Sequence, residues 1–276
     1  MSYLSAIILG IVQGVSEFLP ISSSGHLSIL QNFFSFSDVE HDHLFFDLLL
    51  HFGTLIAVFA AYRQDIVDLI SEFISMVKRE PSPMGKAAGI ANRRTILLVV
   101  VATLPLFLIL PIKDKVENLY YNTIFIGFAL IVTGLILFLS DRVRHGRKNA
   151  RSATVVDALI VGLGQAIATV PGISRSGTSI SAGLFCGFER SFAVKFSFLM
   201  SIPAILGANI LSIGDAISAG IDWSVFPQYM VGVLAAMISG YLCLSFLKRI
   251  AQKGFAGFSY YCWGAGAVTL ILSLIK

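Results

Sequence analysis

Long apolar runs separated by short polar segments dominate the chain. A helix needs about 20 apolar residues to cross a lipid bilayer, and six runs reach that length. They cover residues 45–63, 95–112, 121–140, 192–213, 225–247 and 257–275. The pattern therefore predicts an all-α polytopic membrane protein with six transmembrane helices.

Two further apolar segments are interrupted near their middle. The first covers 3–19 and 23–36 and breaks at Pro20-Ile21-Ser22-Ser23-Ser24-Gly25, and the second covers 155–170 and 176–188 and breaks at Pro171-Gly172-Ile173-Ser174-Arg175-Ser176-Gly177. Proline and glycine end helices. We expect each segment to form a re-entrant helical hairpin that enters the membrane and returns.

The two broken segments resemble each other. Gly10, Gln13, Ile21, Ser22, Ser24 and Gly25 recur 152 residues later as Gly162, Gln165, Ile173, Ser174, Ser176 and Gly177. Equivalent segments entering from opposite faces are typical of an inverted-topology repeat, whose broken helices meet near the membrane midplane. We expect one transmembrane domain, residues 1–276, with pseudo-repeats of about 1–150 and 151–276. The alternative is chance similarity between two Ser/Gly kinks.

Composition agrees with a membrane protein, because 56% of the residues are hydrophobic and only 13% are charged. Soluble domains carry about 25% charged residues. The mean hydropathy is +0.82. The net charge of +4 does not indicate nucleic-acid binding, because the basic residues lie between apolar runs rather than in one patch.

The basic residues also predict an orientation. Loops 71–94, 141–154 and 248–256 hold 13 of the 20 Lys and Arg residues. Cytoplasmic loops are rich in Lys and Arg. We therefore expect these loops inside and both termini outside, with the first hairpin entering from outside and the second from inside.

The interrupted segments carry polar groups suited to an anion. Irregular backbone at membrane depth occurs where it is buried in protein or lines a wet cavity, and the N-terminus of a helix attracts phosphate. The hydroxyls expected to bind phosphate are those of Ser22, Ser23, Ser24, Ser174, Ser176, Thr178 and Ser179. Helix capping by these serines is the alternative. Arg175 can grip two phosphate oxygens or form a structural ion pair with Glu17.

Gln13 and Glu17 lie four residues apart and share one helix face. Their oxygen atoms suit a hard divalent cation such as Mg²⁺ or Ca²⁺, although a polar contact between helices is the alternative. Asp47 and His51 repeat this spacing and either extend the site or form a packed polar pair. His26 follows Ser-Gly at the start of a half-helix, where it can attack phosphorus or activate Ser23.

These motifs resemble those of the bacterial undecaprenyl pyrophosphate phosphatase family of the bacitracin-resistance type. The matching residues are Gln13-Gly-Val-Ser-Glu17-Phe-Leu-Pro-Ile-Ser22-Ser23-Ser24-Gly25-His26 and Pro171-Gly172-Ile173-Ser174-Arg175-Ser176. Both motifs lie at their expected places, and the resemblance covers essentially the whole chain.

The resemblance implies an inner-membrane hydrolase that removes the terminal phosphate of a C55 prenyl diphosphate and yields the carrier for peptidoglycan synthesis. It implies divalent-metal dependence, an outward-facing site, a homodimer and bacitracin resistance. By position, Gln13 and Glu17 match the acidic/amide motif, and Ser23 and His26 match the proposed nucleophile or base. Arg175 with Ser174 and Ser176 matches the phosphate-binding loop. A transporter or flippase of a polyprenyl phosphate lipid is the alternative that an inverted repeat also suits.

Overall fold

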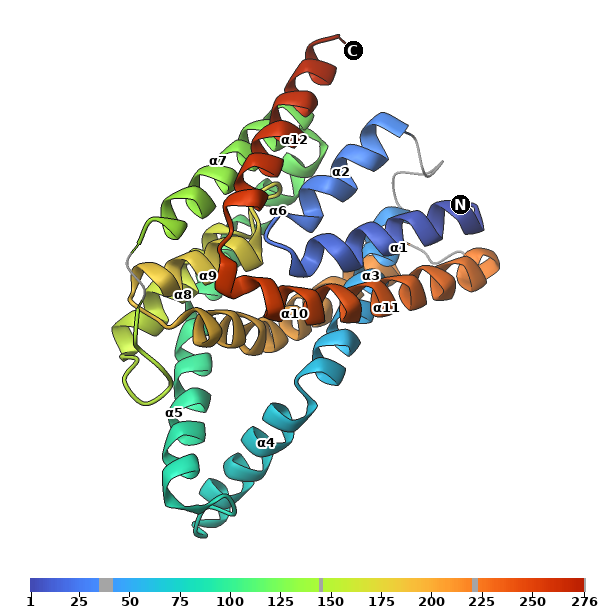
Figure 1. The fold of residues 1–276 in the computed structure, drawn as a ribbon. Helices are drawn as coiled ribbons and strands as arrows, with labels where there is room; N and C mark the ends of the chain where they lie inside the picture. Colours follow the sequence, from blue (N-terminus) through green and yellow to red (C-terminus); the bar gives the residue numbers. More distant parts are fainter. Residues whose placement is uncertain (35–41, 144–145, 220–222, 276) are drawn as a thin grey trace.

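The computed structural model describes residues 1–34, 42–143, 146–219 and 223–275, where the regular structure is helical apart from one isolated bridge between Lys148 and Phe188 (Figure 1). The α-helices are α1 (Tyr3–Phe18), α2 (Ser23–Phe34), α3 (Asp42–Ala61), α4 (Arg63–Lys78), α5 (Gly85–Thr103), α6 (Lys113–Asn118), α7 (Thr123–Asp141), α8 (Val155–Ile167), α9 (Arg175–Phe185), α10 (Arg190–Ala219), α11 (Phe226–Ile250) and α12 (Ala256–Ile275). Short 3₁₀ turns cover Leu104–Leu108, Leu110–Ile112, Leu119–Tyr121, Trp223–Val225 and Ala251–Lys253.

Among the described residues, five helical segments are long and apolar enough to cross a membrane. They are Gly85–Tyr121, Thr123–Asp141, Arg190–Gly214, Trp223–Lys253 and Ala256–Ile275. Phe45–Ala61 and Arg63–Lys78 make a sixth if they cross as one span, although they bend by 82° at their junction. The prediction of an all-α polytopic membrane protein is therefore confirmed.

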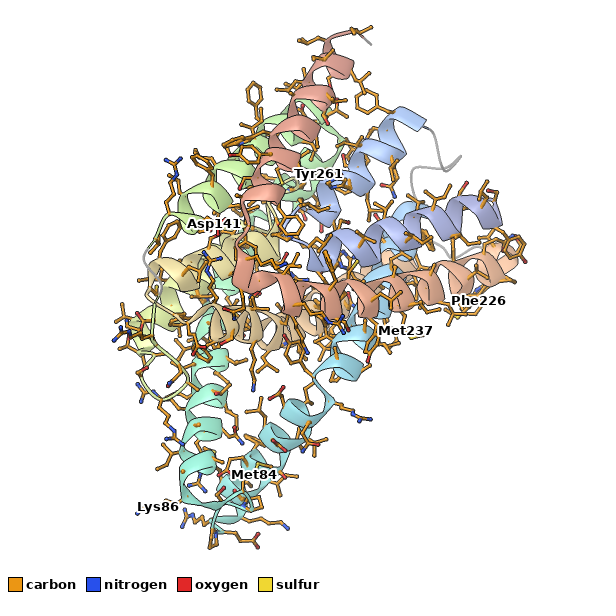
Figure 2. The ribbon with its side chains drawn as sticks, viewed as in Figure 1. Met84, Lys86, Asp141, Phe226, Met237 and Tyr261 are labelled. Carbon is orange, nitrogen blue, oxygen red and sulfur yellow. The ribbon has the colours of Figure 1, made fainter. Side chains whose placement is uncertain are left out.

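Most of the predicted basic loop 71–94 is helical. α4 continues to Lys78 and α5 begins at Gly85, and the two form a hairpin that extends away from the other helices, with Met84 and Lys86 at its tip (Figure 2). The buried Glu72 of α4 joins the two arms, because it accepts hydrogen bonds from Ser82 (2.5 Å) and Arg93 (2.6 Å). Residues 144–145 of predicted loop 141–154 and 35–36 of predicted segment 23–36 lie outside the described residues.

α1 packs closely along α11 and also contacts α3, as the blue and orange ribbons of Figure 1 show. Glycine makes the close approach of α1 and α11 possible. A methyl carbon on Gly14 would lie 2.4 Å from the carbonyl oxygen of Ala236 in α11, which is less than van der Waals contact. This packing fixes the face of α1 that carries Gln13 and Glu17, both buried.

The chain turns sharply at two places, the first elbow (residues 17–25, from the last turn of α1 to the first turn of α2) and the second elbow (residues 168–177, from the end of α8 to the first turn of α9). The elbows contact each other. The backbone N–H of Gly172 donates to Ser24 Oγ (3.3 Å), and Ser176 Oγ donates to the carbonyl of Leu19 (3.3 Å). α7 supports the second elbow, because Thr133 Oγ1 donates to the Gly172 carbonyl and accepts from the N–H of Ser174.

Candidate active site

Glu17 and Arg175 form an ion pair where the elbows meet. Glu17 lies in the last turn of α1 and Arg175 is the first residue of α9. Nη2 of Arg175 donates to Oε1 of Glu17. The Glu17 side chain is 3% exposed and that of Arg175 is 24% exposed, so the pair is largely removed from solvent. The structure thus contains the ion pair that the sequence offered as one interpretation of Arg175.

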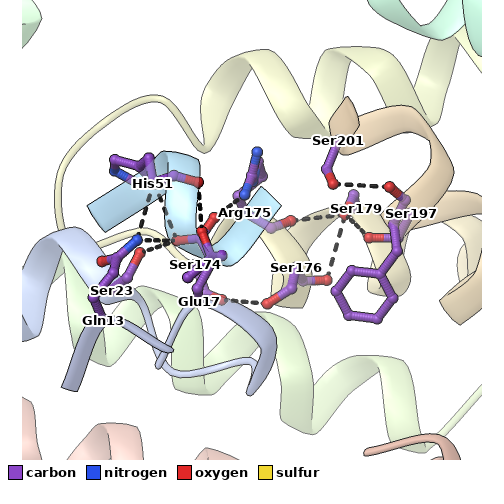
Figure 3. Close-up of polar contacts among 12 residues, drawn as sticks. Gln13, Glu17, Ser23, His51, Ser174, Arg175, Ser176, Ser179, Ser197 and Ser201 are labelled. Carbon is purple, nitrogen blue, oxygen red and sulfur yellow. Dashed lines mark hydrogen bonds and ion pairs between the residues drawn. The ribbon is translucent and has the colours of Figure 1, made fainter. Parts of the chain in front are cut away.

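Three polar side chains surround the other carboxylate oxygen of Glu17, Oε2 (Figure 3). Ser23 Oγ, in the first turn of α2, donates to Oε2 over 2.6 Å, and Gln13 Nε2 donates to it over 3.1 Å. Nδ1 of His51, in α3, lies 3.7 Å from the same atom. Three helices therefore place a hydroxyl, an amide and an imidazole around one oxygen.

His51 and Asp47 have different neighbours although they share a helix. Gln13 Nε2 lies 3.0 Å from His51 Nδ1, and since an amide nitrogen can only donate, Nδ1 accepts. Asp47 accepts hydrogen bonds from Gln31 (3.2 Å) and Tyr120 (3.4 Å) instead. Of the two interpretations offered for this pair, His51 extends the site and Asp47 belongs to a neighbouring polar contact.

The ring nitrogens of His26 bond to residues other than Glu17 and Arg175. Nδ1 donates to the carbonyl oxygen of Ser22 over 2.7 Å, and Nε2 accepts from the Tyr261 hydroxyl of α12 over 2.8 Å. The two rings stack with centroids 5.6 Å apart. Both ring nitrogens are therefore engaged outside the cluster around Glu17.

The remaining predicted phosphate-binding hydroxyls shape the elbows. Ser22 and Ser24 are hydrogen-bonded at 3.3 Å, as are Ser174 and Ser176. Ser174 also caps α9 by accepting from the N–H of Gly177 (3.1 Å). The capping interpretation thus holds for Ser174, whereas Ser23 alone of these hydroxyls bonds Glu17 within the described part of the chain.

Ser179 and Thr178 lie deeper in α9. Ser179 Oγ donates to the carbonyl of Arg175 and bonds Ser197 of α10, both over 2.7 Å. Thr178 Oγ1 is buried and has no hydrogen-bond partner among the described residues. Ser179 therefore braces the helix that carries Arg175 rather than facing Glu17.

Ser22 has a left-handed backbone, with φ of 72°. A non-glycine residue in this region is strained, and such strain gathers at functional sites. At Ser22 this conformation turns the chain from α1 into α2, so that Ser23 comes back to Glu17 only six residues further along the chain. The backbone at Ser22 therefore sets the serine–carboxylate contact.

Several supporting residues carried no recognisable signal in the sequence. Thr133 lies within an apolar span, and Tyr120 and Tyr261 read as aromatic residues near helix ends. Each acts through a contact between segments far apart in the chain. Only the tertiary packing identifies them.

The donor atoms around Glu17 fit a divalent cation. In the described part of the chain no three His, Cys, Asp or Glu side chains are placed to hold a metal ion, so a metal here requires the Gln13 amide. Oε1 of Gln13 is buried without a hydrogen-bond partner among these residues. An orphaned amide oxygen beside a carboxylate is a suitable pair of ligands for a hard cation, with the other ligands coming from substrate phosphates and water.

Comparison with known proteins identifies the family. The bacitracin resistance protein BacA family matches residues 6–268. The chain is 41% identical over 278 residues to an undecaprenyl-diphosphatase of Alkaliphilus metalliredigens, with 100% of both chains covered. It is 42% identical to that of Carboxydothermus hydrogenoformans (99% of this chain, 98% of the relative) and 40% identical to that of Methanobrevibacter smithii (99% of each). The chain therefore belongs to the bacitracin resistance protein BacA family.

Proposed function

We propose that this protein is an undecaprenyl-diphosphatase, a membrane hydrolase that removes the terminal phosphate of a C55 prenyl diphosphate. The monophosphate product is the lipid carrier recycled for peptidoglycan synthesis, and this recycling confers bacitracin resistance. The observation that carries the proposal is the meeting of Ser23, Glu17 and Arg175 at the two elbows. Relatives about 40% identical over the whole chain carry the same name.

Arg175 is the group best suited to hold the diphosphate. An arginine within an apolar helix bundle is costly unless it is paired or hydrated, and here Glu17 pairs with it. Its second terminal nitrogen and the helix N-terminus at which it lies favour an anion. The diphosphate lies against Arg175 while the prenyl chain stays in the lipid.

Ser23 is the nucleophile that the geometry favours. Its Oγ lies 2.6 Å from Glu17 Oε2, within the reach of a general base. As Oγ bonds to the terminal phosphorus, its proton passes to Glu17 and the bond from phosphorus to the bridging oxygen breaks, releasing the prenyl monophosphate. Water then hydrolyses the phosphoserine. His26 is the alternative nucleophile or base, but both its nitrogens have other partners.

A divalent ion, Mg²⁺ or Ca²⁺ by the oxygen donors, would be held by Gln13 and Glu17. When bound, it would withdraw charge from the transferred phosphoryl group. Arg175 supplies fixed positive charge to the same group, and the backbone at the elbows keeps it in place.

The re-entrant hairpins and the inverted repeat are part of the proposal. Contacts that recur 152 residues apart support them. Ser22 Oγ accepts from the N–H of Gly25 over 3.2 Å, and Ser174 Oγ accepts from that of Gly177 over 3.1 Å. Elbows with matching internal bonds that also contact each other are expected of two half-sites related by a pseudo-twofold axis.

The finer localisation follows from this arrangement. We place both termini outside the bacterial plasma membrane, because the basic loops define the cytoplasmic side, and we place the site on the outer side, as the family resemblance implies. A homodimer in the membrane, in contact with its lipids, belongs to the same proposal. Labelling of single cysteines introduced near each terminus in intact cells tests the orientation.

The test of function is phosphate release from C55 prenyl diphosphate by the purified protein in detergent. We expect hydrolysis by the wild type and a loss of at least about 10²-fold in Arg175→Lys, because lysine keeps the charge but loses the planar fork. The matched control is Arg142→Lys, an exposed arginine stacked on Phe138, which should stay near wild type. Movement of the headgroup across vesicles without phosphate release would instead favour the flippase.

A further inference from the structure

Three side-chain atoms at the candidate site form a compact triangle. The terminal amide nitrogen of Gln13 lies 3.1 Å from Oε2 of Glu17 and 3.0 Å from Nδ1 of His51, and the last two atoms are 3.7 Å apart. Gln13 and Glu17 come from one face of α1, and His51 comes from α3, which packs against it. Figure 3 shows the three side chains converging.

The size of this triangle is that of one face of a metal coordination sphere. Around a six-coordinate ion with bonds of about 2.1 Å, neighbouring ligand atoms lie about 3.0 Å apart, and around a four-coordinate ion with such bonds about 3.4 Å apart. Two edges match the six-coordinate value, and the third, between Glu17 and His51, is about 0.7 Å wider than that value. A movement of the His51 ring toward Glu17 by about this distance gives the face of a six-coordinate ion.

The Gln13 amide places its nitrogen in the triangle, and an amide nitrogen does not bind a metal ion. The amide oxygen, which could bind one, lies beside the triangle. Its nitrogen donates to both neighbours, while its buried oxygen has no partner among the described residues. A half-turn of the planar amide exchanges the two atoms. The triangle would then consist of an amide oxygen, a carboxylate oxygen and the lone pair of an imidazole nitrogen.

We propose that His51 is the third protein ligand, with Gln13 and Glu17, of the divalent cation at this site. The proposal rests on the proposed function, and it changes the expected metal. Imidazole suits transition ions, whereas Mg²⁺ and Ca²⁺ prefer oxygen. A mixed set of two oxygens and one nitrogen should therefore bind Mn²⁺ more tightly than Ca²⁺.

The surrounding charges agree with a metal that binds together with substrate. Arg175 occupies Oε1 of Glu17, and Oε2 is the oxygen that belongs to the triangle while it also accepts the hydrogen bond of Ser23. The positive charge of Arg175 opposes a cation, and the negative charge of a diphosphate offsets both. Asp47, one turn from His51, is bonded to Gln31 and Tyr120 and lies outside the ligand set.

The test is spectroscopic and needs no turnover. Full-length protein purified through a histidine-free tag is loaded with Mn²⁺ together with methylenediphosphonate, a diphosphate mimic that cannot be hydrolysed, and electron spin echo envelope modulation is recorded. We expect the modulation of a directly bound ¹⁴N, which changes when histidine is labelled with ¹⁵N and disappears in His51→Gln. Calorimetric Mn²⁺ affinity should fall at least about tenfold in His51→Gln, and the wild type should bind Ca²⁺ more weakly than Mn²⁺.

Two matched variants complete the design. His26→Gln removes a histidine that bonds Ser22 and Tyr261, and Asp47→Asn removes a carboxylate from the same helix as His51. Both should keep the ¹⁴N signal and bind Mn²⁺ within about threefold of wild type, since neither is a ligand. Loss of the signal in either variant but not in His51→Gln overturns the assignment, as does bound Mn²⁺ without a nitrogen signal in the wild type.

The outcomes separate this inference from the proposed function. Wild-type protein that hydrolyses the lipid diphosphate but gives no histidine nitrogen signal keeps the function and removes His51 from the metal. Protein that gives the signal but releases no phosphate keeps the ligand and refutes the phosphatase. Absence of Mn²⁺ binding also refutes the inference.

Discussion

Oε1 of Glu17 accepts a hydrogen bond from Arg175 although the two residues are 158 positions apart in the chain. The contact joins the end of α1 to the start of α9, and it lies where the two elbows meet. The two oxygens of Glu17 therefore have different partners, because Oε1 pairs with Arg175 and Oε2 accepts the hydrogen bond of Ser23. Activity and stability should therefore both depend on this one carboxylate.

We predict that Glu17→Gln lowers stability and activity together. Removing one partner of a buried ion pair leaves the other charge uncompensated, which lowers the free energy of unfolding by roughly 3 kcal/mol. In the double variant Glu17→Gln/Arg175→Gln no charge is stranded, so it should unfold at a higher temperature than Glu17→Gln alone while staying inactive. Thermal unfolding in detergent and phosphate release measure the two effects. A double variant less stable than both single variants would mean that the pair is not the stabilising contact.

Ser23→Ala should lower kcat by about 10²–10⁴-fold with little change in KM, because it removes the attacking oxygen and keeps Arg175 and the helix termini for binding. The matched change is Ser24→Ala, which loses a 3.3 Å bond to Gly172 and should cost less than about tenfold. Steady-state kinetics on both variants make the comparison. Equal losses at the two serines would identify a role in the elbow rather than in chemistry.

The parts of this site that local sequence could predict are those with local causes. Proline, serine and glycine in an apolar run mark both elbows, and the four-residue spacing of Gln13 and Glu17 puts them on one face. The partners of His51 could not be predicted, because they depend on how α3 packs on α1. The same holds for Thr133, whose hydroxyl looks incidental within an apolar span but bonds the second elbow twice.

The helical character of residues 71–94 was missed for a related reason. Its Lys and Arg residues made the segment look like a loop, whereas buried Glu72 and its bonds to Ser82 and Arg93 hold two helices together there. The density of charged residues distinguishes segments that face lipid from segments that face water. It does not distinguish a water-exposed helix from a loop. The hydrophobic runs therefore predict where the spans lie more accurately than where the helices end.

Tyr261 should act on the reaction only through His26, which bonds the carbonyl of Ser22 beside the proposed nucleophile. Its hydroxyl donates to Nε2 of His26, and the rings stack. Tyr261→Phe keeps the ring and removes the hydrogen bond, so we expect a change in kcat of about two- to tenfold, equivalent to the net value of one hydrogen bond. In a His26→Gln background the same substitution should add nothing. Additive effects in the double variant would show that Tyr261 acts independently of His26.

The contact between α1 and α11 gives the clearest test of the fold. A methyl carbon on Gly14 would meet Ser239 Oγ at 2.1 Å and the Ala236 carbonyl oxygen at 2.4 Å, so the helices must separate. We expect Gly14→Ala to cost about 1–3 kcal/mol and to reduce activity, because Gln13 and Glu17 move with α1. Gly264 of α12 is the control, since a methyl carbon there meets nothing within 4 Å.

Alanine at position 264 should instead raise stability by up to about 1 kcal/mol through helix propensity. Thermal unfolding in detergent and phosphate release compare the two variants at one protein concentration. The sign of the difference decides the matter, because both substitutions add the same methyl group to a helix. If Gly14→Ala were as stable and as active as Gly264→Ala, α1 could not lie as close to α11 as the structure has it, and the position of Glu17 would have to be revised.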